Sequence, residues 1–121
     1  MKAVLDDPQK GFYLLAWLDG GPVGQVLITR EWSDWRAGWF WWLQSAYVSD
    51  DVRRQGVFRA LYDAVLARAE ERDDVFGLRL YLHESNRKAD KVYARLGFAE
   101  TEYTMRSLRW VKDITISPQE R

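Results

Sequence analysis

The feature that most constrains the fold is a change of hydrophobic period near residue 48. Three apolar runs of strand length precede it: residues 12–18, 23–29 and 39–48. Four apolar residues at helical spacing follow it: Phe58, Leu61, Val65 and Ala69. A chain that passes from strands to a helix in this way is expected to combine both element types in one sheet-based domain.

The second half of the chain continues the alternation of strand and helix. Residues 76–82 alternate between apolar and polar, which predicts a strand. Residues 85–86 (Ser-Asn) predict the start of a helix that Gly97 ends, and residues 103–116 predict one or two further strands. The predicted order is β-β-β-α-β-α-β. The first three strands should be antiparallel, with a turn at residues 19–22, and the strands joined by helices should be parallel.

Tryptophan is concentrated in the strand region, because six of the seven tryptophans lie between Trp17 and Trp42. Successive strand residues alternate between faces, so Trp39 and Trp41 should share one face, and Phe40 and Trp42 the other. One pair can fill a core beneath the helices. The other pair needs a cover, and three interpretations stay open: a substrate pocket with an aromatic floor, a dimer interface, or more core.

Composition excludes several classes of function. The 18 basic residues balance 18 acidic ones and no segment has a large excess, which gives no electrostatic case for nucleic-acid binding. The chain has no cysteine and one histidine, so disulfides, thiolate zinc sites, a cysteine nucleophile and a two-histidine metal site are excluded. We expect no metal. No apolar run reaches the roughly 20 residues of a membrane span, and the first residues do not resemble a signal peptide. We therefore expect one cytoplasmic domain over residues 1–121, without a membrane or nucleic-acid partner.

The segment between the third strand and the first helix, residues 48–59, carries the clearest chemical signal. Helix N-termini have unpaired backbone N–H groups and a partial positive charge. Gly56 allows close approach of a ligand, and three arginines add positive charge: Arg53, Arg54 and Arg59. The segment is neither a Walker loop nor a Gly-x-Gly-x-x-Gly motif. It favours a pyrophosphate ligand, with a solvated basic helix start as the alternative.

The run Arg53-x-x-Gly56-x-Phe58 resembles the acyl-CoA-binding signature of the GNAT superfamily of N-acetyltransferases, Gln/Arg-x-x-Gly-x-Gly/Ala. The later run Asn86-x-x-Ala89-x-x-x-Tyr93-x-x-x-Gly97-Phe98 resembles a second motif of the same family. The likeness covers about residues 12–106. It implies an α+β fold with a mostly antiparallel mixed sheet and helices packed on it. It also implies a single acyl-CoA-binding domain without the family's usual N-terminal strand and helix pair.

The resemblance departs from the family pattern at two positions of the first motif. Phe58 stands where glycine or alanine is usual, so its side chain must point away from the phosphates, toward the core, or narrow the site. Arg54 stands where glycine is frequent.

The resemblance implies acetyl-CoA as co-substrate and an amine as acceptor. The backbone amides of residues 54–58 would cradle the pyrophosphate, and residues 46–48 would pair with the pantetheine arm. A main-chain N–H near Tyr47 or Val48 would polarise the thioester carbonyl. Asn86 would hydrogen-bond the pantetheine or a water. The residues implied in acyl-CoA binding are Ala46, Tyr47, Val48, Arg53, Arg54, Gln55, Gly56, Val57, Phe58, Arg59 and Asn86.

The resemblance further implies that Tyr93 donates a proton to the leaving thiolate, with a packed core tyrosine as the alternative. A carboxylate or an ordered water should take the proton of the amine. Glu31 is favoured as this carboxylate because it lies among tryptophans, and Glu84 comes next. Asp34 is a further carboxylate near a strand end. The lone His83 is interpreted as structural. We expect an N-acetyltransferase in which the amine attacks acetyl-CoA directly in a ternary complex. A homodimer through the Trp-rich strands is a further expectation. The alternatives are an acyl-CoA-binding module without acetyl transfer and an interaction domain with an aromatic face.

Overall fold

The structure is a computed structural model that describes residues 7–109 and 118. Its elements are β1 (Phe12–Leu18), β2 (Gly21–Ser33), β3 (Gly38–Val48), the 3-10 helix η1 (Asp50–Val52), α2 (Val57–Glu70), β4 (Val75–Arg79) and α3 (Arg87–Arg95). The predicted α+β class and the predicted order of strands and helices are confirmed through α3. No helix within the described ranges is long and apolar enough to cross a membrane.

The strand predicted from residue 103 onward does not form in residues 103–109. The hydroxyl of Thr101 donates to the carbonyl oxygen of Tyr103 over 3.1 Å, and the Tyr103 amide donates back to that hydroxyl oxygen over 3.3 Å. Such local side-chain bonds compete with strand pairing for the backbone groups. The remainder of the predicted segment, residues 110–116, lies outside the described residues.

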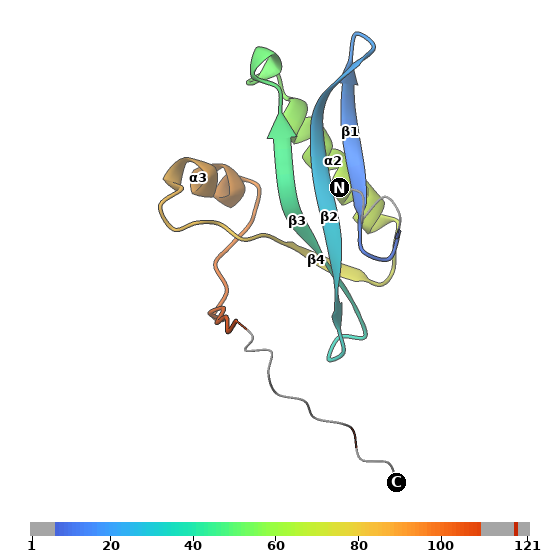
Figure 1. The fold of residues 1–121 in the computed structure, drawn as a ribbon, viewed down its shortest axis with the longest axis vertical. Helices are drawn as coiled ribbons and strands as arrows, with labels where there is room; N and C mark the ends of the chain where they lie inside the picture. Colours follow the sequence, from blue (N-terminus) through green and yellow to red (C-terminus); the bar gives the residue numbers. More distant parts are fainter. Residues whose placement is uncertain (1–6, 110–117, 119–121) are drawn as a thin grey trace.

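The sheet has the order β1-β2-β3-β4. The pairs β1–β2 and β2–β3 are antiparallel, and β3–β4 is parallel, as predicted for strands joined by a helix. Helix α2 makes the crossover between β3 and β4 and lies behind the sheet in Figure 1, while α3 lies to the side of β3. The face of the sheet opposite α2 is turned toward the viewer.

The hairpin turn is shorter than predicted. Only Asp19 (φ 52°) and Gly20 (φ 81°) lie between the strands, and Gly21 and Pro22 already belong to β2. Two residues with positive φ suffice because that turn matches the right-handed twist of the strands. At the other end, β2 continues past residue 29 to Ser33, because Trp32 and Trp39 form a cross-strand pair with ring centroids 5.0 Å apart.

The core lies between α2 and the sheet. Its fully buried residues are Val26, Ile28, Trp41, Leu61 and Val65. Trp39 packs against this cluster, so the pair Trp39 and Trp41 fills the core, as one of the two pairs was predicted to do. The other pair is covered from β4 and the residues after it: the Arg79 guanidinium lies 3.7 Å from the Phe40 ring centroid, and Tyr81 stacks on Trp42 at 4.3 Å.

The pairing of β3 with β4 is short and leaves an edge of β3 open. The parallel register runs only from Trp39 to Trp42, where Trp42 lies opposite Arg79. A bulge at Gln44 shifts the register between β2 and β3 directly afterwards. Beyond Arg79 the chain turns away toward α3 while β3 continues to Val48 (Figure 1). Within the described residues, the Leu43–Val48 edge of β3 therefore has no strand partner on that side.

Candidate functional site

A pocket of about 360 Å³ lies where β3 ends and α2 begins. It is lined by Val48, Arg53, Arg54, Gly56, Val57, Phe58 and Arg59. These are seven of the eleven residues that the sequence implicates in acyl-CoA binding, and the structure brings them together around one cavity. We call this cavity the arginine pocket. Of the other four, Ala46, Tyr47 and Gln55 are exposed beside it, and Asn86 lies at the start of α3.

Backbone N–H groups at the start of α2 are open to a ligand. Gly56 is the N-cap residue with φ 81°, and no side chain caps the helix there. The first hydrogen bond of the helix runs from the Ala60 amide to the Gly56 carbonyl over 3.0 Å. The three preceding amides, of residues 57–59, therefore lack helical partners. The predicted cradle of amides 54–58 is wrong at Gln55, whose amide donates to the Val52 carbonyl over 3.3 Å. Arg54 also has a positive φ of 69°, and such alternation of backbone handedness turns N–H groups toward a common point that suits an anion.

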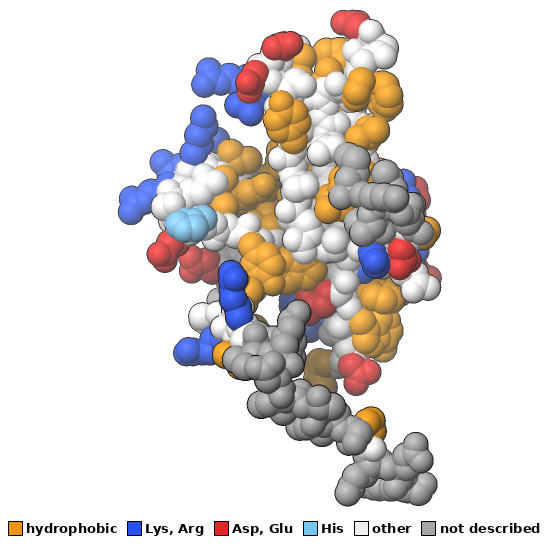
Figure 2. Space-filling model, viewed as in Figure 1, with side chains coloured by type: hydrophobic (Ala, Val, Ile, Leu, Met, Phe, Trp, Pro, Cys, Tyr) orange, Lys and Arg blue, Asp and Glu red, His pale blue; other side chains and the backbone are white. Residues whose placement is uncertain are grey.

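The arginines of this pocket differ in their pairing. Arg53 forms a salt bridge with Asp50 at 2.9 Å, and Arg59 forms one with Asp63 at 3.0 Å. Arg54 forms no salt bridge with any residue that the structure describes. Lys and Arg side chains gather along the side formed by α3 and the start of α2 (Figure 2). The chain is neutral overall, but α3 alone carries four basic residues against one acidic residue: Arg87, Lys88, Lys91, Arg95 and Asp90.

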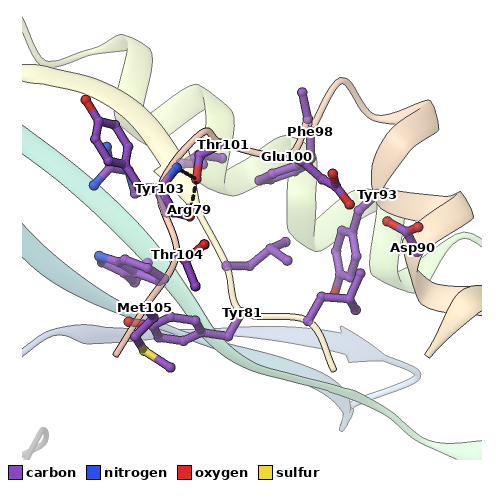
Figure 3. A pocket seen from close by; sticks show the side chains of 15 residues that line it. Arg79, Tyr81, Asp90, Tyr93, Phe98, Glu100, Thr101, Tyr103, Thr104 and Met105 are labelled. Carbon is purple, nitrogen blue, oxygen red and sulfur yellow. Dashed lines mark hydrogen bonds between the residues drawn. The ribbon is translucent and has the colours of Figure 1, made fainter. Parts of the chain in front are cut away.

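A second, larger pocket of about 480 Å³ lies where β3 and β4 part. Its walls include five aromatic side chains: Trp42, Tyr81, Tyr93, Phe98 and Tyr103. Asp90 and Glu100 are the acidic residues of its lining, and Arg79 is the basic one. In Figure 3, Tyr93, Asp90 and Glu100 stand on one side of the cavity, and Tyr81, Tyr103 and Met105 on the other. We call this cavity the aromatic pocket.

Tyr93 is half-buried between aromatic rings. Its ring contacts Phe58 edge-on with centroids 6.0 Å apart, and Phe98 edge-on at 5.6 Å. Burial raises the pKa of the Tyr93 hydroxyl above its usual value, so the hydroxyl is protonated at neutral pH. Phe58 lines the arginine pocket and also contacts Tyr93, which explains how a large residue fits there: its ring turns toward α3 instead of the core.

Glu31 lines neither pocket but supports a wall of the aromatic pocket. Its Oε1 accepts a hydrogen bond from the Trp42 indole over 2.7 Å and one from Arg79 over 3.1 Å. Glu84 is exposed in the turn before α3 and lies outside both linings. His83 pairs its Nδ1 with the Ser85 hydroxyl over 2.7 Å, so it stabilises the same turn.

Asn86 caps α3, as its position before the helix predicts. Its Oδ1 accepts a hydrogen bond from the Ala89 amide over 3.2 Å. The side-chain NH₂ of Asn86 points away from this bond as a donor group and can donate to a ligand while the oxygen caps the helix.

The sequence did not single out several residues of the aromatic pocket. Arg79, Tyr81, Asp90 and Glu100 come from β4, the loop after it, α3 and the segment after α3, and folding alone brings them together. One signal existed: Asp90 precedes Tyr93 by one helical turn, so both lie on the same helix face. No group of three or more potential metal ligands occurs within the described ranges.

Comparison with known proteins places these features in a family. The model of the acetyltransferase (GNAT) family matches residues 1–98. A possible acetyltransferase from Clostridium difficile 630 is 35% identical, with a TM-score of 0.86, over 91% of this chain and 72% of that one. The ribosomal-protein-alanine N-acetyltransferase from Brucella melitensis biovar Abortus 2308 is 25% identical, with a TM-score of 0.75, over 90% and 77%.

The same fold occurs in an aminoglycoside N-acetyltransferase whose structure contains CoA. It is 19% identical, with a TM-score of 0.75, over 91% of this chain and 83% of that one. No functionally curated protein matches the chain. The family match over most of the chain, together with the 35% identical structure, shows that this chain belongs to the GNAT family of acetyltransferases.

Proposed function

We propose that this chain is an N-acetyltransferase that moves an acetyl group from acetyl-CoA to an amine by direct attack in a ternary complex. The observation that carries the proposal is the placement of the two pockets at opposite ends of the open β3 edge. The arginine pocket includes Val48 at one end, and the aromatic pocket includes Trp42 at the other. From Trp42 to Val48 the strand spans roughly 20 Å at about 3.3 Å per residue, which suits an extended arm.

The arginine pocket would hold the pyrophosphate of the co-substrate. The open amides of residues 57–59 donate to phosphate oxygens, and Arg54, which has no salt bridge within the described residues, adds attraction. Residues 46–48 pair with the pantetheine arm like an added strand, and a main-chain N–H near Tyr47 or Val48 donates to the thioester carbonyl. The NH₂ group of Asn86 donates to the same arm or to a water beside it. The four basic residues of α3 reinforce the attraction for the phosphates.

Tyr93 would act as the acid of the reaction. The amine nitrogen forms a bond to the carbonyl carbon, the carbon–sulfur bond breaks, and its electron pair stays on sulfur. The Tyr93 hydroxyl gives its proton to that sulfur, and the amine gives up one proton to a base, so protons balance. The raised pKa of Tyr93 keeps the acid in its protonated form. Since the chain has no cysteine, no acyl-cysteine intermediate is involved.

Two carboxylates are proposed as the base, Glu31 first and Glu84 second. Glu31 is favoured because both of its hydrogen-bond partners, Trp42 and Arg79, line the aromatic pocket. A water between Glu31 and the amine would carry the proton to the carboxylate. Glu84 would reach the pocket only with a movement of the turn before α3.

A thiol-release assay with acetyl-CoA and a panel of amines tests the proposed function. We expect CoA to be released only when an amine is present, with an initial rate that saturates in both substrates. Calorimetric binding of acetyl-CoA without release for any amine would instead favour the acyl-CoA-binding module. Absence of both binding and release would favour the interaction domain.

A homodimer is proposed through apolar side chains that the strands leave exposed. Trp39, Trp41 and Trp42 are buried or covered. The Trp-rich strands still expose Trp17 of β1 (62%) and Trp32 of β2 (49%), and Leu15 of β1 is 48% exposed. Light scattering of the wild-type protein and of Trp17→Arg tests this assignment. A dimer that the substitution dissociates supports it, and a monomer at high concentration contradicts it.

A further inference from the structure

We propose that the aromatic pocket selects an acceptor with a second positive charge, so that the protein acetylates diamines in preference to monoamines. The inference rests on the proposed acetyl transfer, because it assigns this pocket to the acceptor. It adds a substrate class that follows from the walls and the charges of the cavity.

The walls of the pocket suit an alkyl chain that carries an ammonium group. Tyr81 stacks on Trp42 with centroids 4.3 Å apart and an interplanar angle of 29°, yet it is 59% exposed. One face of the Tyr81 ring is therefore used for stacking, and the remainder is available to a ligand. Tyr93 and Tyr103 add further aromatic surface to the lining. Such surfaces attract cations through the negative faces of their rings.

The charges of the lining also favour a cation. Arg79, the basic residue of the lining, donates to Glu31 over 3.1 Å and lies 3.7 Å from the Phe40 ring centroid. Its charge is balanced outside the pocket, and one of its faces is covered. Asp90 and Glu100 form no salt bridge with any part of residues 7–109. The pocket therefore presents two carboxylates without a compensating cation from its own lining.

The proposed base, Glu31, already serves the nitrogen that reacts, so these two carboxylates are assigned to a second nitrogen. An amine attacks only when it is uncharged, whereas a carboxylate stabilises the charged ammonium. Asp90 and Glu100 stand beside Tyr93 in Figure 3, close to the proposed acid. They are therefore suited to hold a second ammonium of the same molecule, while its uncharged nitrogen reaches the thioester. A diamine can supply both an uncharged nitrogen that attacks and a charged ammonium that the carboxylates hold, whereas a monoamine supplies only the nitrogen that attacks.

Three acceptors of equal chain length test the proposal: hexylamine, diaminohexane and aminohexanoate. We expect kcat/KM for diaminohexane to exceed that for hexylamine by about 10-fold, the effect of one charge-assisted hydrogen bond, with aminohexanoate the poorest. Glu100→Gln and Asp90→Asn should each remove most of this preference, because each lowers kcat/KM for diaminohexane more than kcat/KM for hexylamine. Glu102→Gln is the matched control, because Glu102 is exposed, loses the same charge and lies outside the lining.

Saturation-transfer NMR of diaminohexane, with CoA present, supplies a readout that does not need acetyl transfer. Binding that Glu100→Gln weakens about 10-fold, and Glu102→Gln leaves unchanged, supports the assignment of the second ammonium to these carboxylates by a measurement that is separate from the proposed acetyl transfer. Equal kcat/KM for hexylamine and diaminohexane would overturn the inference and leave the proposed function intact. Diamine binding that is absent, or insensitive to Glu100→Gln, would overturn the inference as well.

Discussion

The arginine pocket and the aromatic pocket are built in opposite ways. All seven residues of the first come from one segment, Val48 to Arg59, whereas the second takes its lining from β3, β4, α3 and the segment after α3. The first would bind acetyl-CoA, as proposed, through backbone groups whose direction is set by a single helix start. The second depends on side chains that distant elements hold in place. A local feature of this kind can be found in a sequence, while an assembled one requires the fold.

Because the two pockets are built differently, variants of each pocket should change a different property of the protein. Changes at the arginine pocket should alter the affinity for acetyl-CoA, and changes at the aromatic pocket should alter turnover and choice of acceptor. Phe58 is the exception, because it lines the first pocket and contacts Tyr93 in the second. Variants of residues in the two pockets can therefore show whether acetyl-CoA affinity and turnover change independently or together.

The largest effect is expected from Tyr93→Phe. The substitution removes the hydroxyl but keeps the edge-on ring contacts with Phe58 and Phe98. Loss of a general acid should lower kcat roughly 100-fold or more, with the acetyl-CoA dissociation constant nearly unchanged. Steady-state kinetics and calorimetry measure the two quantities. Equal loss of turnover and affinity would mean that Tyr93 only packs.

The pH profile of the wild-type enzyme provides a second check on Tyr93. Because burial raises the pKa of this tyrosine above its ordinary value of about 10, deprotonation should remove the acid only at higher pH. We therefore expect kcat to show no loss attributable to Tyr93 as the pH rises from 7 to about 10. A fall within that range that disappears in Tyr93→Phe would contradict the assignment.

Gly56→Asp should weaken acetyl-CoA binding by about 50-fold, because like charges brought together cost several kcal/mol. Gly20→Asp is the matched control: both glycines have φ 81° and open space where a Cβ atom would lie, but Gly20 belongs to the hairpin turn. Calorimetry measures the dissociation constants, and thermal unfolding measures stability. Equal weakening in both variants would indicate backbone strain and would contradict the pyrophosphate assignment.

Phe58→Ala tests the contact that joins the two regions. It should destabilise the protein by about 2 kcal/mol, because a half-buried ring is lost, and lower kcat about 10-fold because Tyr93 loses a supporting ring. Urea unfolding and steady-state kinetics measure the two effects. Phe76→Ala is the control, since Phe76 is exposed on β4 and lies in neither lining. Unchanged turnover in Phe58→Ala would show that the pockets are independent.

The smallest effect is expected at Arg54, where a non-glycine residue has a φ of 69°. Arg54→Gly and Arg54→Ala remove the same charge, but only glycine relieves the left-handed conformation. Arg54→Gly should therefore be the more stable variant by about 1 kcal/mol in urea unfolding. Both should weaken acetyl-CoA binding to the same few-fold extent. A large difference in affinity would mean that loop conformation, and not charge, dominates binding.

Much of the fold could be predicted because local patterns matched tertiary packing. The strand over residues 12–18 and the Asn86 cap were predicted correctly, since each follows from neighbouring residues. The strand expected to reach residue 82 ends at Arg79, because β3 and β4 diverge after this residue. The alternation of apolar and polar residues within a strand does not show where its neighbouring strand turns away. The strand expected from residue 103 fails in residues 103–109, where Thr101 binds the backbone of Tyr103 locally.

The candidate site also combines residues that a local motif indicates with residues that only the fold brings together. One motif indicates the residues of the arginine pocket, whereas Glu100 and Tyr81 have no local signal. The tryptophan neighbours of Glu31 favour it as a base, and the structure adds partners that the sequence could not give, the Trp42 indole and the Arg79 guanidinium. Those contacts span 11 and 48 positions of the chain.

Backbone NMR with a CoA titration tests the central claim most directly, that one bound molecule runs from the arginine pocket along the open β3 edge to the aromatic pocket. We predict that the largest shifts of amide resonances occur at residues 54–59 and 43–48, with smaller shifts near Tyr93, all at one dissociation constant. Shifts confined to other parts of the chain, or none at saturating CoA, would contradict it.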